Sequence, residues 1–250
     1  MTLDQLAQAA NNGDVESMFT LGNHYFDQKQ WTDAWEWLTK AAENGHVGAA
    51  AIALLFGDSI ARAFESIPLY DKAFDAWSKC YDCFDLVWNN DIAESAKKMA
   101  SGKVVDIVYG MGYCKYCLAA VNSDSSEYAN AKVYFESIAA NMDDPRAKVM
   151  TGLCYSSLGD YASAFPFLKE MKSNINLGKD GINFEAWMTL ALIHRTADSL
   201  SIPGVHTNMA AAYQCVAEAA KIPGSCGEFA QKDLQKYRKN FFGKITYIDD

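Results

Sequence analysis

One spacing of residues occurs twice in this chain, and it constrains the fold more than any other feature. Gly22, Tyr25, Ala34 and Leu38 recur at the same offsets as Gly152, Tyr155, Ala164 and Leu168, 130 positions further along. Small residues at two fixed positions allow two helices to cross closely, and the large residues then fill the contact beside them. The spacing therefore predicts a helical hairpin that is used more than once.

Start and stop signals surround both copies of this pattern. Asp14 is expected to cap the first helix of the first copy, and Gly45 is expected to end its second helix. In the second copy, Asp144-Pro145 reads as an N-cap followed by proline in the first helical position, and Gly159 ends that helix. Each copy is therefore expected to consist of two helices joined by a short turn.

Three further segments keep the second helix of the pattern, with an alanine, a large residue and a small residue, after a longer turn. They are Ala73, Trp77 and Cys80, then Ala131, Phe135 and Ile138, and then Ala212, Val216 and Ala219. Ala53, Gly112 and Ala191 take the close-crossing position in the helices before them. The predicted repeats are 15–45, 46–88, 103–142, 144–175 and 183–222.

The remaining segments are predicted to be helical as well. The 58 residues between Ala73 and Ala131 leave room for one extra helix near 91–101, capped by Asp91, or for a continuous helix that runs on into Lys103. Short helices at 3–10 and 225–242 would cap the two ends of the array, and 244–250 would be a tail. The sequence thus predicts one all-α domain over 1–243.

The end of the first repeat carries a resemblance to a known family. The run Ala41-Ala42-Glu43-Asn44-Gly45-His46, together with the turn Pro203-Gly204-Val205 before Asn208, resembles Sel1-like repeats. These are relatives of tetratricopeptide (TPR) repeats that are frequent in bacteria. The resemblance covers about 15–222 and implies a right-handed α-solenoid that acts as a scaffold for other proteins.

Charge and composition narrow the expected partners and compartment. The net charge is −9, and the only basic cluster is Lys232, Lys236, Arg238 and Lys239, so nucleic-acid binding is not expected. The longest apolar run, 47–57, is too short to span a membrane, and an acidic residue stands where a signal peptide would be basic. Seven cysteines, an odd number, fit a reducing compartment. We expect a cytoplasmic protein with no membrane partner.

Two CxxC pairs, Cys80/Cys83 and Cys114/Cys117, are the strongest candidates for a metal or redox site. Four thiolates can hold zinc in a tetrahedral site, which would make the chain a metal- or redox-responsive regulator. Both pairs, however, fall within predicted helices, and Cys80 takes a repeat position that requires a small buried residue. Core packing is therefore favoured over metal binding, and no cofactor is predicted.

Catalytic motifs are missing from the sequence. It contains no HExxH, no Gly-x-Ser-x-Gly and no phosphate-binding loop, and the repeat pattern holds no two carboxylates together. The chain is therefore predicted not to be an enzyme, with an enzyme built on an α-solenoid as the remaining alternative.

In solenoids of this kind the first helix of each hairpin lines the concave face. Positions counted from the close-crossing residues give a predicted partner-binding groove, which is largely aromatic and aliphatic with acidic residues at its margin. Its members are Phe19, Asn23, Phe26, Tyr109, Tyr113, Tyr116, Leu153, Met188, Leu192 and Arg195. Such a surface suits an apolar or basic segment of another protein, with Tyr113 and Tyr116 as central anchors. The alternative is that the groove is filled internally.

Overall fold

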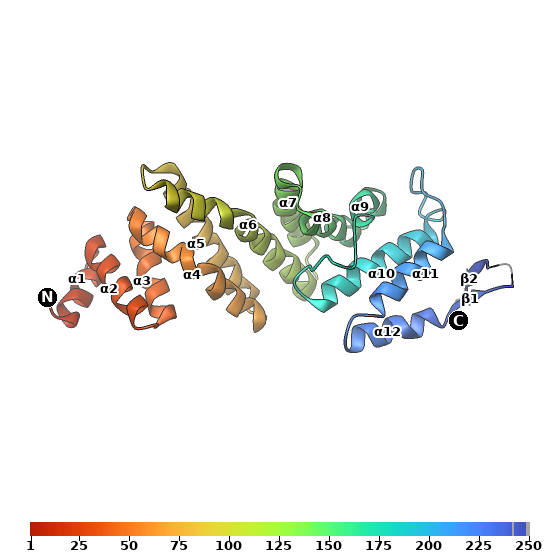
Figure 1. Cartoon of the computed structure of the whole chain (residues 1–250), viewed down its shortest axis with the longest axis horizontal. Helices are drawn as coiled ribbons and strands as arrows, with labels where there is room; N and C mark the ends of the chain where they lie inside the picture. Colours follow the sequence, from red (N-terminus) through yellow and green to blue (C-terminus); the bar gives the residue numbers. More distant parts are fainter. Residues whose placement is uncertain (242, 249–250) are drawn as a thin grey trace. The chain divides into compact units, whose positions relative to one another are not determined.

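A computed structural model describes residues 1–241 and 243–248, and within them the chain is predominantly helical (Figure 1). The chain divides into two compact units, 1–123 and 124–250. The sequence predicts one domain over 1–243, whereas the boundary between the units falls inside the predicted repeat 103–142.

The first unit consists of six helices, and each packs against the next along the chain (Figure 1). They are α1 (Leu3–Asn11), α2 (Val15–Asp27), α3 (Trp31–Glu43), α4 (Val47–Ser66), α5 (Tyr70–Asn89) and α6 (Glu94–Asn122). The predicted hairpins 15–45 and 46–88 correspond to α2/α3 and α4/α5. The predicted N-terminal cap corresponds to α1.

The second unit contains six helices and a β-hairpin among its described residues. They are α7 (Ser125–Met142), α8 (Pro145–Ser157), α9 (Tyr161–Leu168), α10 (Asp180–Thr196), α11 (Met209–Ala219), α12 (Ser225–Leu234), β1 (Tyr237–Lys239) and β2 (Ile245–Tyr247). The two strands are antiparallel, with Tyr237 opposite Tyr247. The predicted hairpins 144–175 and 183–222 correspond to α8/α9 and α10/α11, which pack against each other in pairs.

The two equivalent hairpins, α2/α3 and α8/α9, have the caps and glycine stops that the sequence indicates. The side chain of Asp14 accepts a hydrogen bond from the backbone N–H of Ser17, and Asp144 accepts from Arg146 and Ala147 in the same way. Gly45 and Gly159 have φ of 86° and 81°, a left-handed conformation that glycine adopts without a steric penalty. Both predicted caps and both predicted glycine stops are confirmed.

The close crossing that defines the repeat is present in both copies. A Cβ atom added to Gly22 would lie 2.7 Å from Cγ of Leu38, and one added to Gly152 would lie 2.8 Å from Cγ of Leu168. Ala34 and Ala164 are fully buried beside them. The small residues therefore stand where the two helices touch, as the spacing predicts.

Two predicted features of the ends and the middle differ from the structure. In the middle, the predicted N-cap Asp91 is wrong, because the helix begins at Glu94 after an Ala93 N-cap, whereas the alternative of a continuous helix into Lys103 is confirmed by α6. The cap helix predicted over 225–242 ends at Leu234, and the chain then forms the β-hairpin. Part of the predicted tail 244–250 is strand β2, and residues 242, 249 and 250 lie outside the described residues.

Candidate protein-binding surface

Three predicted groove residues lie along α2 in the first unit. Phe19, Asn23 and Phe26 are each half-buried. The ring of Phe19 stacks on the imidazole of His46, with the centroids 4.1 Å apart and the planes at 24°. His46 in turn caps α4, because its Nδ1 accepts a hydrogen bond from the backbone N–H of Ala49. One face of α2 is thus partly accessible and partly fixed against the start of α4.

The three tyrosines on α6 do not form an accessible surface. Tyr109, Tyr113 and Tyr116 retain 8%, 3% and 2% of their surface. Burial, followed by the proximity of Cys117 and Tyr70, raises the pKa of the Tyr113 phenol above its usual range. The expectation that these rings are exposed anchors is corrected here, because they belong to the core of the first unit.

The predicted groove residues of the second unit differ in how deeply they are buried. Leu153 on α8 is fully buried, so its predicted place on an accessible groove is wrong and it belongs to the core. Met188 and Leu192 on α10 are half-buried. Arg195, at the end of α10, is engaged by the C-terminal part of the chain. Its guanidinium lies over the ring of Tyr247 at 4.1 Å, and its Nη1 is 3.5 Å from Oδ2 of Asp233.

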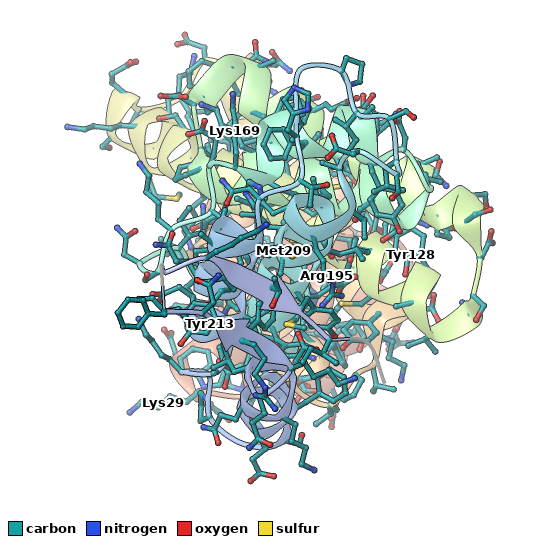
Figure 2. The ribbon with its side chains drawn as sticks, turned by 90° about the vertical axis from the view of Figure 1, so that its right-hand side faces the viewer. Lys29, Tyr128, Lys169, Arg195, Met209 and Tyr213 are labelled. Atoms are coloured by element: carbon teal, nitrogen blue, oxygen red, sulfur yellow. The ribbon has the colours of Figure 1, made fainter. Side chains whose placement is uncertain are left out.

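Tyr247 also donates a hydrogen bond through its hydroxyl to Asp233, at 2.7 Å. Arg195 and Tyr213 lie on the side of the unit that carries the β-hairpin (Figure 2), and the ring of Tyr213 contacts that of Tyr237. The sequence missed this arrangement because it predicts helix, not hairpin, after Leu234. Arg195 therefore serves to hold the C-terminal segment on α10.

An exposed aromatic cluster that the sequence did not single out surrounds Phe26. The ring of Phe26 lies 5.4 Å from that of Trp31 and 5.5 Å from that of Phe56, and Trp31 and Phe56 are 5.9 Å apart. Trp31 is 44% exposed, while Phe26 and Phe56 are half-buried. We refer to Phe26, Trp31 and Phe56 as the aromatic patch. It combines the end of α2, the start of α3 and the middle of α4.

The predicted groove does not include Phe56, because positions on α4 are counted in steps of three and four from the close-crossing residue Ala53. Ala50, Leu54 and Gly57 are the positions of α4 that correspond to Phe19, Asn23 and Phe26 of α2, and all three are buried. The accessible side of α4 is displaced by about one residue, to Leu55 and Phe56, and Leu55 is 52% exposed. The signal that could have found it is the unbroken run Leu54-Leu55-Phe56, which is apolar on more than the one face that packs inward.

A second group of aromatic residues lies along α5, with Tyr81 and Trp88 exposed and Phe84 half-buried. Tyr81, Phe84 and Trp88 follow one another at helical spacing, with ring centroids 6.0 Å and 5.9 Å apart. Trp88 is 47% exposed, about the same as Trp31. We refer to Tyr81, Phe84 and Trp88 as the aromatic ladder. Unlike the aromatic patch, it is formed by a single helix.

The cysteine pairs are built into the core of the first unit. Cys80, Cys83, Cys114 and Cys117 are all buried. Burial, and then the charges of Asp82 and Glu43, raises the pKa of Cys83 to about 12, so its thiol is unreactive at neutral pH. Within 1–241 and 243–248, no three His, Cys, Asp or Glu side chains are grouped so that they could hold a metal ion.

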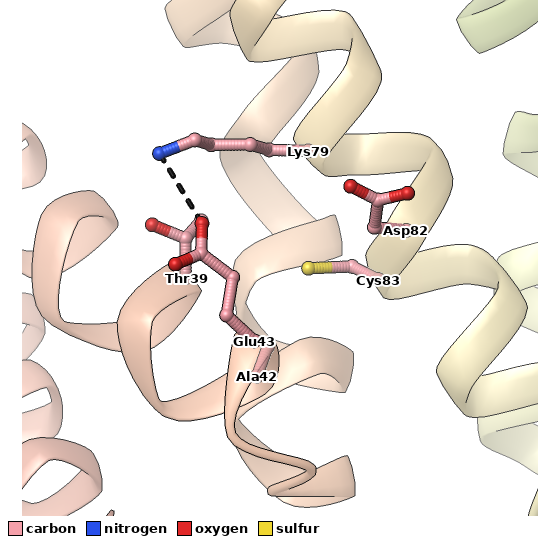
Figure 3. A pocket seen from close by; sticks show the side chains of 6 residues that line it. All are labelled: Thr39, Ala42, Glu43, Lys79, Asp82 and Cys83. Atoms are coloured by element: carbon pink, nitrogen blue, oxygen red, sulfur yellow. Dashed lines mark ion pairs between the residues drawn. The ribbon is translucent and has the colours of Figure 1, made fainter.

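A small cavity lies where α3 meets α5 (Figure 3). It is lined by Thr39, Ala42, Glu43, Lys79, Asp82 and Cys83, and Lys79 pairs with Glu43 at 3.4 Å. Burial, followed by the charges of Glu43 and Asp85, raises the pKa of Asp82. The cavity volume of about 30 Å³ suits a water molecule and not a substrate, since small-molecule sites occupy roughly 300–1,000 Å³.

Two helices of the first unit, α4 and α6, are long and apolar enough to cross a membrane by length and composition. In the most apolar 18-residue stretch of each helix, 33% of the residues of α4 and 61% of those of α6 are buried inside the structure. Both helices pack along α5, and the core helix of a globular protein meets the same criterion.

Comparison of the sequence with models of known protein families and with curated proteins finds no match. The fold and the exposed surface therefore supply the arguments about function.

Proposed function

We propose that this chain is a non-catalytic adaptor or scaffold built from TPR-like, specifically Sel1-like, helical repeats, and that it binds an apolar or basic segment of another protein. The observation that carries the proposal is the aromatic patch. Three aromatic rings from three helices meet at the surface of the first unit, with Trp31 almost half exposed. Exposed aromatic clusters of this kind mark protein-binding sites more often than isolated apolar residues do.

The assignment to a repeat family is supported by the two equivalent hairpins. Gly22 meets Leu38 as Gly152 meets Leu168, at the same offsets and nearly the same distance. We propose five such repeats with right-handed superhelical stacking. The third, 103–142, includes the part of α6 from residue 103 onward in the first unit and α7 in the second.

The proposal includes no catalytic step, and it assigns the chain to the cytoplasm. Six of the seven cysteines are buried within helices, as expected for thiols that pack as small apolar side chains in a reducing compartment. We propose no role in nucleic-acid binding, because the chain is acidic overall.

Affinity capture with two matched variants tests this function. The immobilised full chain, its Trp31→Ala variant and its Trp88→Ala variant are each exposed to an extract of the source cells, and the retained proteins are quantified by mass spectrometry. The two tryptophans are almost equally exposed, so both substitutions should leave the far-UV circular dichroism unchanged. We expect at least one protein to be retained by the wild type and by Trp88→Ala but depleted at least tenfold with Trp31→Ala. A retained set that is identical for all three, or no retained protein, would overturn the proposal.

A further inference from the structure

We infer that the aromatic patch binds a basic amphipathic segment, one in which lysine or arginine alternates with leucine-like residues at helical spacing. This inference rests on the proposed function and specifies the chemistry of the partner. It follows from where the negative charge of the chain lies relative to the patch.

Most of the net negative charge of the protein lies in the N-terminal segment that contains the patch. Residues 1–66, which comprise α1 to α4, contain nine Asp and Glu but three Lys and Arg, a net charge of −6 out of −9 for the whole chain. Lys40 pairs with Glu36 at 2.7 Å, and two further carboxylates pair with lysines outside the segment, Glu43 with Lys79 at 3.4 Å and Asp58 with Lys103 at 3.1 Å. An electrostatic field of this sign attracts a cationic segment and repels anionic lipid surfaces and phosphates.

The segments beside the patch show the same imbalance. Asp27 follows Phe26 at the end of α2, and Asp33 lies in the first turn of α3 after Trp31; both are exposed. Lys29, in the turn that joins α2 to α3, is the one basic residue between them. A cationic side chain over an exposed tryptophan face gains a cation–π interaction, and carboxylates at the rim add charge complementarity.

The aromatic ladder on α5 provides an internal comparison. Trp88 has nearly the exposure of Trp31, and Asp82 and Asp85 lie between Tyr81 and Trp88, but residues 67–123 as a whole contain seven Asp and Glu and six Lys and Arg, a net charge of −1. A surface that only required exposed aromatic rings would treat the two sites alike. A surface that recognises a cationic segment would favour the patch.

Three labelled peptides of identical length test the charge of the occupant. Each places leucine at helical spacing, and the intervening positions are all lysine, all glutamine or all glutamate. Fluorescence anisotropy at 50 mM NaCl should show the Leu/Lys peptide binding the full chain at least tenfold more tightly than the Leu/Glu peptide, with Leu/Gln between them. Raising NaCl to 500 mM should weaken the Leu/Lys complex at least fivefold, because exposed charges are screened.

Variants of the chain test the location. Trp31→Ala should weaken binding of the Leu/Lys peptide at least tenfold, whereas Trp88→Ala should change it less than twofold. The double variant Asp27→Asn/Asp33→Asn should weaken it several-fold. Lys29→Glu should strengthen it, and this gain cannot arise from misfolding.

The outcomes separate this inference from the proposed function. If cellular partners depend on Trp31 but Leu/Gln or Leu/Glu binds as tightly as Leu/Lys, the adaptor function stands and the basic partner is overturned. If the Leu/Lys peptide binds the Trp31→Ala chain as tightly as the Trp88→Ala chain, its attraction is diffuse and the patch is not its site. If neither the peptide nor any cellular protein depends on Trp31, both proposals fail.

Discussion

The hairpin α2/α3 and the hairpin α8/α9 have equivalent contacts between their two helices, but the outer face of the first helix is buried to different extents. In both, a glycine of the first helix lies against a leucine of the second, with the added Cβ at 2.7 Å and 2.8 Å from the leucine Cγ. On the other face of the first helix the two diverge. Phe19 and Asn23 on α2 are half-buried, whereas their equivalents Val149 and Leu153 on α8 are fully buried.

The neighbours of each helix account for this divergence. Helix α8 packs against α7, α9 and also α10, whereas the packing of α2 is mainly against α1 and α3. Val149 and Leu153 are apolar where α8 is fully buried, whereas the equivalent face of α2 carries the polar Asn23 and is half-buried. The repeat spacing therefore determines how a hairpin closes, while the surface it leaves for a partner depends on what packs against it.

The largest expected effect tests whether the two interiors are energetically equivalent. Leu38→Ala and Leu168→Ala each remove a fully buried side chain, and each should lower the free energy of unfolding by about 2–5 kcal/mol. Urea denaturation followed by circular dichroism measures both. If one substitution costs less than about 1 kcal/mol, the two hairpins are similar in sequence alone and the comparison fails.

A reciprocal exchange tests the two surfaces. Leu153→Asn places an amide in a fully buried position and should cost about 3 kcal/mol, because neither the lost burial nor the unpaired amide is offset. Asn23→Leu, at the equivalent position of α2, should change stability by less than about 0.5 kcal/mol. Equal costs in the two variants would show that α2 is covered as completely as α8.

The interior of the hairpins could be predicted from the sequence because it depends on local rules. Capping by Asp14 and Asp144, the glycine stops, and the match of small to large residues are all determined within one or two turns of helix. The helical content and the two equivalent hairpins were predicted for this reason. The sequence does not predict the C-terminal β-hairpin, because Tyr247 lies against Arg195, a residue of α10 that is distant in the sequence.

The candidate site could be predicted only in part, for the same physical reason. Phe26 was identified, but its neighbours Trp31 and Phe56 come from two other helices, and their meeting depends on how α3 and α4 pack. Tyr113 and Tyr116 were assigned to the surface because their spacing is that of a groove-lining face. The same spacing describes a buried face, and periodicity does not distinguish the two.

A smaller effect tests the close crossing itself. Gly22→Ala and Gly152→Ala each add a methyl group that would overlap the leucine of the facing helix, so each should cost about 1–2 kcal/mol. Alanine normally stabilises a helix relative to glycine, so a loss of stability would identify the steric contact as its cause. Gly102→Ala in α6, where an added Cβ meets nothing within 4 Å, is the matched control and should be stabilising. If Gly22→Ala and Gly152→Ala also stabilise the protein, the helices are not in the close contact described.

The smallest expected effect concerns the two N-caps, which share a residue type but differ in their surroundings. Asp14 accepts one backbone hydrogen bond, whereas Asp144 accepts two and also pairs with the guanidinium of Arg146 at 2.7 Å. Burial raises the pKa of the Asp144 carboxyl, but the hydrogen bonds and charge of Arg146 outweigh it and hold this pKa below its usual value. A carboxyl with a lowered pKa in the folded state stabilises the protein above its unfolded pKa, near 4, and this contribution is lost as the pH falls through the folded value.

Asp144→Asn keeps a good N-cap and removes the charge, so it should cost less than about 1 kcal/mol at pH 7, and the difference should shrink toward zero near pH 2–3. Thermal unfolding across that pH range, repeated in an Arg146→Gln background, measures it. The pH-dependent difference should be smaller in that background, and a difference that persists unchanged there would show that Arg146 is not its source.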